Sequence, residues 1–415
     1  MNILILHRVP YPRIEYHRGI DHDKHCVTYF GKREILASIP DDLRCSKVER
    51  PGSASAFEEA RDWLTESKLS FDAVISLSEY ELIDAAQLRE HFGIPGKRVD
   101  QVMLTRDKVL MKQAVARAGL RTPRFLPLRD LLFVHGATSW KTTTVLKPHS
   151  GASSADVVVF DSSRQVFDAI RGKRTGIAKL DGDRPDIGQY QVEEFVRGRI
   201  LHFDGLIAQG ELLAITVSQY VGTCLDYARG QPLGSFHFTL TDEAREWARR
   251  VLNAVSIHDG SFHLEAIDDG AELVFLEVGN RVGVSDVVAT FELATGIHMP
   301  SLELRILLGE AVSVNPSRLL THQLCHGWFV YPGHHVQQGT FQGFDGVDEF
   351  RNSPAVLSWN ELDMGRQLAA NVTYSAHEAP LTGIVATTSS DHTREWIERL
   401  FASASLRVSA SEFSQ

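Results

Sequence analysis

Two glutamates, Glu265 and Glu277, flank a short turn in the segment SFHLEAIDDGAELVFLEVGNRVG, residues 261–283. Apolar and polar residues alternate on both sides of the turn, which is typical of a β-hairpin with one face on the core. With the turn centred near Ala271, the two carboxylates lie opposite each other, and such like charges destabilise a strand pair. Mg²⁺ relieves the repulsion, because it favours one or two carboxylates together with phosphate oxygens. The hairpin predicts a magnesium site, and its alternative is an ordinary solvated face.

The end of this hairpin carries two further polar residues. Asn280 offers another oxygen ligand, and Arg281 offers a cation for a group that is being transferred. The alternation also predicts which residues of the second strand face the core. These are Val274, Leu276 and Val278.

Two lysines lie beside segments that suit phosphate. Lys147 ends an apolar run and precedes the small-residue loop 149–155 (HSGASSA), whose N–H groups and hydroxyls could bind phosphate beside the lysine charge. Lys108 lies in the first turn of a helix predicted over 105–118, with Thr105 as the N-cap. The alternatives are a plain connecting loop and a solvated lysine.

Adjacent glutamates, Glu193 and Glu194, interrupt the apolar strand predicted over 189–196 (QYQVEEFV). Neighbouring strand residues point to opposite faces, so one of the two carboxylates faces inward or toward a cleft. Backbone N–H and C=O groups of this segment could form hydrogen bonds with the edge of an adenine base. The alternative is an edge strand whose charges prevent aggregation.

Several packed units must position these residues, because 415 residues exceed one ordinary core. Short apolar runs alternate with helical patterns up to residue 100, which predicts an open α/β sheet. The runs are 2–7, 26–30 and 71–77, and the helical patterns are 56–66 and 81–92. Later in the chain we expect helices over 241–256 and 290–308, and a β-rich region beyond about 320.

Composition excludes several classes of protein. The formal net charge of -10 argues against nucleic-acid binding as the main role. The four cysteines are far apart, which argues against a zinc or disulfide framework. No stretch approaches the roughly 20 apolar residues that cross a bilayer. A soluble, cytoplasmic protein without a membrane partner is the expectation.

In chain order, these motifs resemble the ATP-grasp superfamily. They are Asp107-Lys108, Val145–Pro148 with its loop, Val192–Val196, His263–Glu265 and Phe275–Glu277 with Arg281. Within the superfamily they resemble the carboxylate–amine ligase branch, which includes L-amino-acid and dipeptide ligases of natural-product pathways. The resemblance spans roughly residues 100–310 and implies an α/β (α+β) ATP-grasp fold. The implied parts are a Rossmann-like α/β domain (1–100), a helix plus lid subdomain (101–196), a C-terminal lobe with the metal site (197–312) and a β-rich subdomain with a tail (313–415).

The resemblance also implies roles for individual residues, with ATP and Mg²⁺ (or Mn²⁺) as cofactors. Arg281 would be catalytic, and it would stabilise charge on an acyl phosphate and the tetrahedral intermediate. The metal ligands would be Glu265, Glu277 and Asn280. The residues that bind ATP would be Lys108, Lys147, Ser150, Gly151, Ser153, Ser154, Glu193, Glu194, Phe195 and Val196. The superfamily usually has asparagine two residues after the second glutamate, where this chain has Gly279.

The implied activity is ATP-dependent formation of an amide from a small carboxylate and a small amine, with release of ADP and phosphate. Amino-acid-like substrates in peptide-antibiotic assembly are the narrower expectation, and a homodimer is the assembly that the resemblance suggests. The alternatives are a ligase that loads a carrier protein and a non-catalytic ATP-binding regulator. Cleft candidates for substrate specificity are Tyr227, His237, His263 and Asp286.

Overall fold

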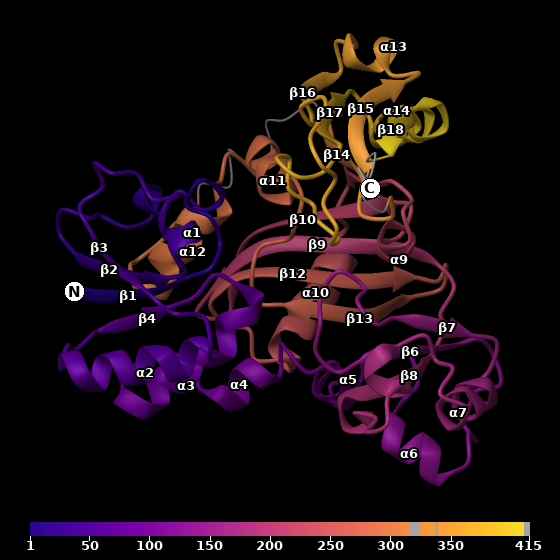
Figure 1. The fold of residues 1–415 in the computed structure, drawn as a ribbon, viewed down its shortest axis with the longest axis horizontal. Helices are drawn as coiled ribbons and strands as arrows, with labels where there is room; N and C mark the ends of the chain where they lie inside the picture. Colours follow the sequence, from indigo (N-terminus) through magenta and orange to yellow (C-terminus); the bar gives the residue numbers. More distant parts are fainter. Residues whose placement is uncertain (315–323, 337–338, 411–415) are drawn as a thin grey trace, which may run out of the picture.

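The computed structural model describes residues 1–314, 324–336 and 339–410. Part of the predicted region 313–415, including the end of its polar tail, therefore lies outside the described residues. Long strands cross the middle of the molecule, with the N-terminal unit at one end and a small sheet below the other (Figure 1). The C-terminal strands rise on the opposite side from the small sheet.

The N-terminal unit is a four-stranded parallel sheet in the order β3-β2-β1-β4. Its strands are β1 (Asn2–His7), β2 (Cys26–Gly31), β3 (Ser46–Glu49) and β4 (Ala73–Ile75). Its helices are α1 (Arg33–Leu36), α2 (Ala56–Ser67), α3 (Leu82–Phe92) and α4 (Val99–Met103). The predicted α/β sheet is present, and the prediction missed β3, an edge strand with exposed charged residues that lacks an apolar run.

Helix α5 (Lys108–Arg117) leads into a small antiparallel sheet in the order β5-β8-β6-β7. The sheet consists of β5 (Phe125–Pro127), β6 (Thr144–Pro148), β7 (Val158–Phe160) and β8 (Tyr190–Glu194). Helices α6 (Leu128–Phe133), α7 (Ser163–Arg171) and α8 (Ala178–Asp181) accompany it. The N-cap of α5 is Asp107 and not Thr105, because the Asp107 carboxylate accepts from the N–H groups of Val109 and Leu110.

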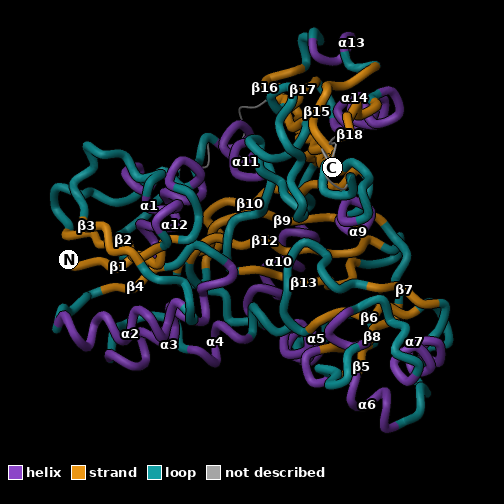
Figure 2. The backbone as a smooth tube through the Cα atoms, viewed as in Figure 1, coloured by secondary structure: helices purple, strands orange, loops and turns teal. Residues whose placement is uncertain are grey.

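The largest sheet is antiparallel throughout, in the order β13-β12-β9-β10-β11-β14-β17-β16. Its strands are β9 (Arg199–Ala208), β10 (Glu211–Val221), β11 (Leu233–Phe238), β12 (Gly260–Asp268), β13 (Leu273–Gly279), β14 (Cys325–Tyr331), β16 (Val356–Glu361) and β17 (Leu381–Thr387). Figure 2 shows these strands in orange from the centre to the C-terminal region. The β-rich segment beyond residue 320 thus extends the sheet that carries the two glutamates.

Helices and a short ribbon complete the large unit. The helices are α9 (Cys224–Ala228), α10 (Asp242–Ala254), α11 (Val287–Thr295), α12 (Met299–Leu307), α13 (Asp348–Arg351) and α14 (Ser390–Ser403). The ribbon pairs β15 (Gly339–Asp345) with β18 (Ser405–Ala410). The single helix predicted over 290–308 is wrong, because Gly296 ends α11 in a left-handed conformation (φ 73°) before α12 begins.

The main core lies between the large sheet and α10. Buried residues of α10, such as Val251 and Leu252, pack against Phe262 and Leu264 of β12 and Phe275 of β13. The apolar side of α10 thus covers one face of the large sheet. The opposite face remains uncovered by α10 and can form a binding site. No helix in the described ranges is long and apolar enough to cross a membrane.

Candidate functional site

A cavity of about 1200 Å³ lies between the N-terminal unit, the small sheet and the large sheet. Glu79 lines it from the loop after β4, and Lys147 lines it from β6. Tyr220 of β10 and Glu265 of β12 form part of its floor, and Tyr374 reaches it from the segment between β16 and β17. The C-terminal region therefore completes the wall of this cavity.

The two glutamates lie opposite each other in the pairing of β12 with β13, as the turn predicted. Both line the cavity. Next to them the register shifts by one residue, since Ala266 pairs with Phe275. This bulge puts Phe275 in the core and Leu276 on the cavity wall, so the predicted core position of Leu276 is wrong.

The acidic pair has an incomplete set of partners. Glu265 Oε1 accepts from the Tyr220 hydroxyl at 2.9 Å, and Glu277 Oε2 lies 3.1 Å from Lys108 Nζ. Burial opposes ionisation of Glu277, but Lys108, Lys147 and Arg281 outweigh it and lower the pKa of Glu277. No hydrogen bond or ion pair within the described chain involves Glu265 Oε2 or Glu277 Oε1. Two facing carboxyl groups, each with an oxygen that accepts no hydrogen bond, form a donor set that fits a hard divalent cation.

Lys108 and Lys147 reach the cavity from different elements, which the loop after β6 joins. Lys108 Nζ donates to the Gly151 carbonyl at 3.1 Å, and its backbone N–H donates to the His149 carbonyl at 2.8 Å. Lys147 Nζ lies 2.6 Å from the Glu193 carboxylate. The start of α5 and the end of β6 are thus fastened together, which holds both ammonium groups on one side of the cavity.

Glu193 points inward and Glu194 points outward, as strand alternation predicts. Glu193 is buried between Lys147 and Lys112, while Glu194 binds Arg124 through the backbone N–H at 2.9 Å and Nε at 2.7 Å. Burial lowers the pKa of Lys112 to about 7. The edge-strand alternative is wrong, because β8 lies between β5 and β6.

The chain leaves the small sheet at residues 195–198, where backbone N–H groups no longer all pair with neighbouring strands. Glu193 pairs with both neighbouring strands, and the Phe195 N–H donates to the Thr143 carbonyl at 2.9 Å. The next residue, Val196, lines the cavity, and its N–H makes no hydrogen bond within the described residues. Of the predicted adenine-binding stretch, Val196 is therefore the residue with a backbone donor to offer.

The loop after β6 is held in an uncommon conformation. Ser153 and Ser154 have φ values of 56° and 54°, in the left-handed region that non-glycine residues seldom adopt. Gly151, Ser153 and Ser154 all line the cavity, as does Tyr374. Backbone strain of this kind is frequent where a loop clamps a ligand.

Arg281 extends from the end of β13 to the same cavity. Its Nε donates to Glu79 at 2.7 Å, and its Nη1 donates to the Val282 carbonyl at 2.9 Å. Burial lowers the pKa of Arg281, but Glu79 and the two cavity glutamates outweigh burial and raise it. Glu79 also pairs with Arg106. Arg281 is therefore a fixed cation, and its Nη2 has no partner among the described residues.

Two predicted site residues do not join the others. Asn280 contacts Lys97 and donates to the Ser261 carbonyl at 2.6 Å, away from the acidic pair. The metal-ligand prediction for Asn280 is wrong, because residues three apart on a strand face opposite sides and Glu277 occupies the cavity side. The Ser150 hydroxyl donates to the Arg106 carbonyl at 3.1 Å, so it fastens the loop and does not face the cavity.

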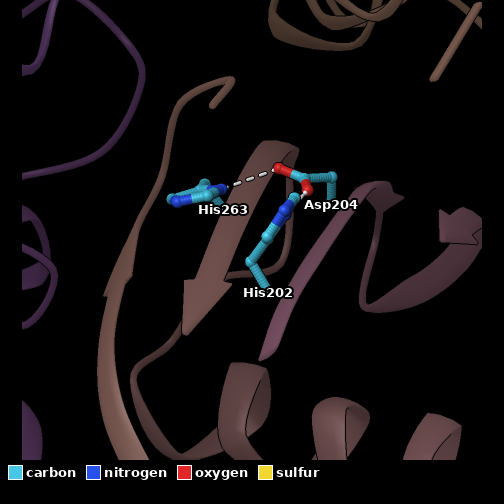
Figure 3. Close-up of side chains that lie close together, drawn as sticks. All are labelled: His202, Asp204 and His263. Atoms are coloured by element: carbon cyan, nitrogen blue, oxygen red, sulfur yellow. Dashed lines mark hydrogen bonds and ion pairs between the residues drawn. The ribbon is translucent and has the colours of Figure 1, made fainter. Parts of the chain in front are cut away.

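Figure 3 shows a buried group of two histidines and an aspartate, His202, His263 and Asp204, whose side chains lie close together. The register of β9 with β12 pairs Asp204 with His263 and His202 with Glu265. The Nδ1 atoms of His202 and His263 donate to the two Asp204 oxygens at 2.5 and 2.8 Å. His263 Nε2 lies 3.4 Å from Glu265 Oε1. The group therefore connects the sheet interior with one member of the acidic pair.

These three residues can be considered as a metal site, since their ligand atoms lie within 4.8 Å of one another. Both Asp204 oxygens, however, already accept from imidazoles. Burial opposes ionisation of Asp204, but the two imidazoles lower its pKa well below the usual range. Asp204 raises the pKa of His263 to about 9 against the effect of burial. The group is better described as an ion-pair network that positions Glu265.

Asp204→Asn should lower the free energy of unfolding by about 3 kcal/mol, because it leaves buried imidazoles without their anion. Urea denaturation measures the difference. Asp242→Asn, at an exposed first-turn position of α10, is the matched control and should change the value by less than about 0.5 kcal/mol. A loss at Asp204 no larger than at Asp242 would contradict the ion-pair network.

Sequence reasoning missed several residues of the cavity. It also missed Lys112, which does not line the cavity but pairs with Glu193 of its wall. Lys112 lies one helical turn after Lys108, a spacing that could have indicated a shared face. Glu79 and Tyr374 are distant in sequence and gave no local signal. Among the cleft candidates, His263 and Asp286 line the cavity. Tyr227 and His237 do not; Tyr227 stacks behind Tyr374 at 4.8 Å between ring centroids.

Comparison with known proteins identifies the fold. No family model matches the sequence. An L-arginine-specific L-amino acid ligase of Bacillus subtilis is 23% identical over 297 residues, which cover 69% of this chain and 68% of that protein. The structure of an L-amino acid ligase from Bacillus licheniformis superposes with a TM-score of 0.70 and 19% identity, over 98% of both chains.

The chain has the ATP-grasp fold. Another ATP-grasp structure, N5-carboxyaminoimidazole ribonucleotide synthetase from Thermotoga maritima, gives a TM-score of 0.63 at 14% identity over 99% of both chains. The biotin carboxylase domain of Hydrogenobacter thermophilus 2-oxoglutarate carboxylase, solved with MgADP, gives 0.66 at 14% identity over 98% of this chain and 90% of that one. The predicted ATP-grasp fold is confirmed, and the chain is similar in sequence to an amino acid ligase.

Proposed function

We propose that this chain is an ATP-dependent ligase that joins a small carboxylate to a small amine through an acyl phosphate. The observation that carries the proposal is the pairing of Glu265 with Glu277 on the wall of a cavity that also holds Lys108, Lys147 and Arg281. Two anions and three cations around one space suit the transfer of a phosphoryl group, where positioning and charge neutralisation supply most of the catalysis. A pure nucleotide sensor has no need of a fixed, partly unpaired arginine at this point.

The nucleotide would lie between the small sheet and the large sheet. Val196 would donate its N–H to the adenine edge, and Leu276 would pack against the base from the large sheet. Lys108 and Lys147 would bind phosphate oxygens, and the loop with Gly151, Ser153 and Ser154 would cover them. Glu265 and Glu277 would hold Mg²⁺, which when bound neutralises phosphate charge.

The reaction has two steps. An oxygen of the substrate carboxylate attacks the γ-phosphorus of ATP, the bond to the ADP oxygen breaks, and an acyl phosphate forms. The neutral amine then attacks the carbonyl carbon, phosphate leaves with the bonding electrons, and a proton is lost to give the amide. Arg281 would stabilise negative charge on the carbonyl oxygen and the leaving phosphate. Closure of the cavity would exclude water, which would otherwise hydrolyse the acyl phosphate.

The test is a matrix of carboxylates and amines incubated with MgATP, read as ADP release and product mass. We expect ADP release to require both a carboxylate and an amine, and the product mass to equal their sum minus water. Release of ADP that no carboxylate–amine pair stimulates would overturn the ligase. Nucleotide binding without turnover would favour a regulator, and mass gain on a carrier protein would favour acyl loading.

Val196→Pro should raise the KM for ATP about 10-fold, because proline removes the backbone donor proposed for adenine. The matched control is Val196→Ala, which keeps the N–H and should change the KM for ATP less than about threefold. Initial rates at varied ATP concentration measure both. Equal KM values for the two variants would show that adenine does not use this N–H.

Two narrower expectations accompany the ligase. Amide formation between amino-acid-like substrates is the chemistry that peptide-antibiotic assembly requires, and that setting stays a prediction. The homodimer also stays a prediction; the similar biotin carboxylase domain forms a dimer. Light scattering of the purified chain during gel filtration measures the mass of the assembly directly.

A further inference from the structure

One member of the acidic pair receives a hydrogen bond from a strand that does not neighbour its own. Tyr220 belongs to β10, and β9 separates β10 from β12, which carries Glu265. The Tyr220 hydroxyl nevertheless donates to Glu265 Oε1 at 2.9 Å, and both residues line the cavity. The large sheet thus supplies a donor to one oxygen of this carboxyl group and, among the described residues, none to Oε2.

The Tyr220 side chain has little freedom to move away from this oxygen. It is 7% exposed, and its ring centroid lies 4.6 Å from that of His202 and 6.2 Å from that of Trp328. His202 is held in turn by the Ser235 hydroxyl at 2.6 Å. Burial, and after it the Glu265 carboxyl group, raise the pKa of Tyr220 well above its ordinary value. The hydroxyl therefore keeps its proton and remains a donor at a fixed point.

The two glutamates of the pair differ in how firmly one oxygen is occupied. Glu277 Oε2 lies 3.1 Å from Lys108 Nζ, which the phosphates of the proposed nucleotide would attract. Glu277 would then have both oxygens available for a cation. Glu265 Oε1 stays engaged, because Tyr220 donates to it from the sheet itself and His263 Nε2 lies 3.4 Å away.

The number of carboxylate oxygens on offer distinguishes Mg²⁺ from Ca²⁺. Mg²⁺ requires near-ideal octahedral geometry at about 2.0–2.1 Å and usually binds one or two carboxylates together with phosphate oxygens. Ca²⁺ takes about 6–8 oxygens at roughly 2.3–2.6 Å and often uses both oxygens of a carboxylate. A carboxylate with one oxygen engaged by a fixed donor therefore suits Mg²⁺ better than Ca²⁺.

We propose that Tyr220 restricts Glu265 to a single coordinating oxygen and thereby selects Mg²⁺ over Ca²⁺ at the acidic pair. This inference rests on the proposed function, because it takes the pair as the cation site of the ligase. Tyr220 acts through Glu265, so it is a positioning residue and not a ligand. Hydrogen bonds of this kind orient metal ligands, and their loss typically weakens metal binding about 10- to 100-fold.

The experiment measures the affinity of the chain for these ions, with the same concentration of ADP in every sample. Mn²⁺ bound to the chain is observed by electron paramagnetic resonance, and Mg²⁺ or Ca²⁺ is titrated to displace it. Tyr220→Phe removes the hydroxyl and keeps the ring. We expect the wild type to bind Mg²⁺ more tightly than Ca²⁺. The variant should lose about 10-fold of this preference, because Mg²⁺ loses an oriented ligand and Ca²⁺ gains the use of Oε1.

Tyr331→Phe is the matched control. Tyr331 is 6% exposed in β14 of the same sheet, its hydroxyl donates to the Leu400 carbonyl at 3.0 Å, and it lies outside the described lining of the cavity. The control should keep the wild-type preference. If Tyr220 has a structural role alone, Tyr220→Phe will lower the melting temperature and leave the preference for Mg²⁺ unchanged, which would overturn the inference.

A second variant serves if Tyr220→Phe does not fold. Tyr220→Met fills the buried space with a flexible apolar side chain that has no hydroxyl, and it should show the same loss of preference. An unchanged preference in Tyr220→Met would overturn the inference. A wild type that binds Ca²⁺ as tightly as Mg²⁺ would overturn it whatever the variants do.

Ion displacement also separates this inference from the proposed ligase. If no carboxylate–amine pair stimulates ADP release, the ligase fails, while the titration still measures the preference and its loss in Tyr220→Phe. If ADP release is stimulated and the preference does not depend on Tyr220, the inference alone fails. A wild type that binds no Mn²⁺ in the presence of ADP would remove the metal assignment and the inference together.

Discussion

Glu277→Gln should lower kcat for ADP release about 10³-fold while nucleotide affinity falls far less. The change removes one of two charges that would hold Mg²⁺ and leaves Lys108 without its anion at 3.1 Å. A loss of that size corresponds to about 4 kcal/mol of transition-state stabilisation. Steady-state ADP release and calorimetric titration with ADP measure the two quantities separately.

The matched control for this variant lies on the same hairpin. Glu272→Gln changes an exposed carboxylate beside the turn, which pairs with Arg121 at 3.1 Å. It should leave the rate within about twofold, since exposed ion pairs contribute little. An unaltered rate in Glu277→Gln would remove the metal assignment.

Arg281→Ala should also lower kcat by about 10³-fold, because the guanidinium is held by Glu79 at 2.7 Å with Nη2 free to stabilise the transition state. The kcat of Arg281→Lys should lie between that of the wild type and that of Arg281→Ala. Lysine keeps the charge, but it lacks the planar fork that binds carboxylate and phosphate oxygens together. Pre-steady-state measurement of ADP formation isolates the phosphoryl-transfer step from product release.

A structural role for Arg281 predicts a different outcome. The arginine also joins the large sheet to Glu79 of the N-terminal unit, so its loss could act through stability alone. In that event the melting temperature would fall and Arg281→Lys would be as inactive as Arg281→Ala. A charge-stabilising role keeps the melting temperature of Arg281→Lys near that of the wild type and restores part of kcat.

The elements that carry the site were largely predictable because their signals are local. Strand alternation and turn length place Glu265 opposite Glu277, and the same rule separates Glu193 from Glu194. The two wrong predictions, for Leu276 and Asn280, arose where the strand departs from regular alternation or ends. A bulge moves Leu276 to the cavity, and Asn280 falls on the opposite side of the strand end.

The sequence by itself determined the acidic hairpin and the lysine at the end of β6, because period and turns are properties of neighbouring residues, and the ATP-grasp fold was implied by the resemblance of the ordered motifs to a known superfamily. Only the tertiary structure decided which distant groups share the cavity. Glu79, Tyr374 and Asp286 come together from three separate segments. The cause is physical: a carboxylate's partners depend on how sheets pack in space, and spacing along the chain carries no record of that packing.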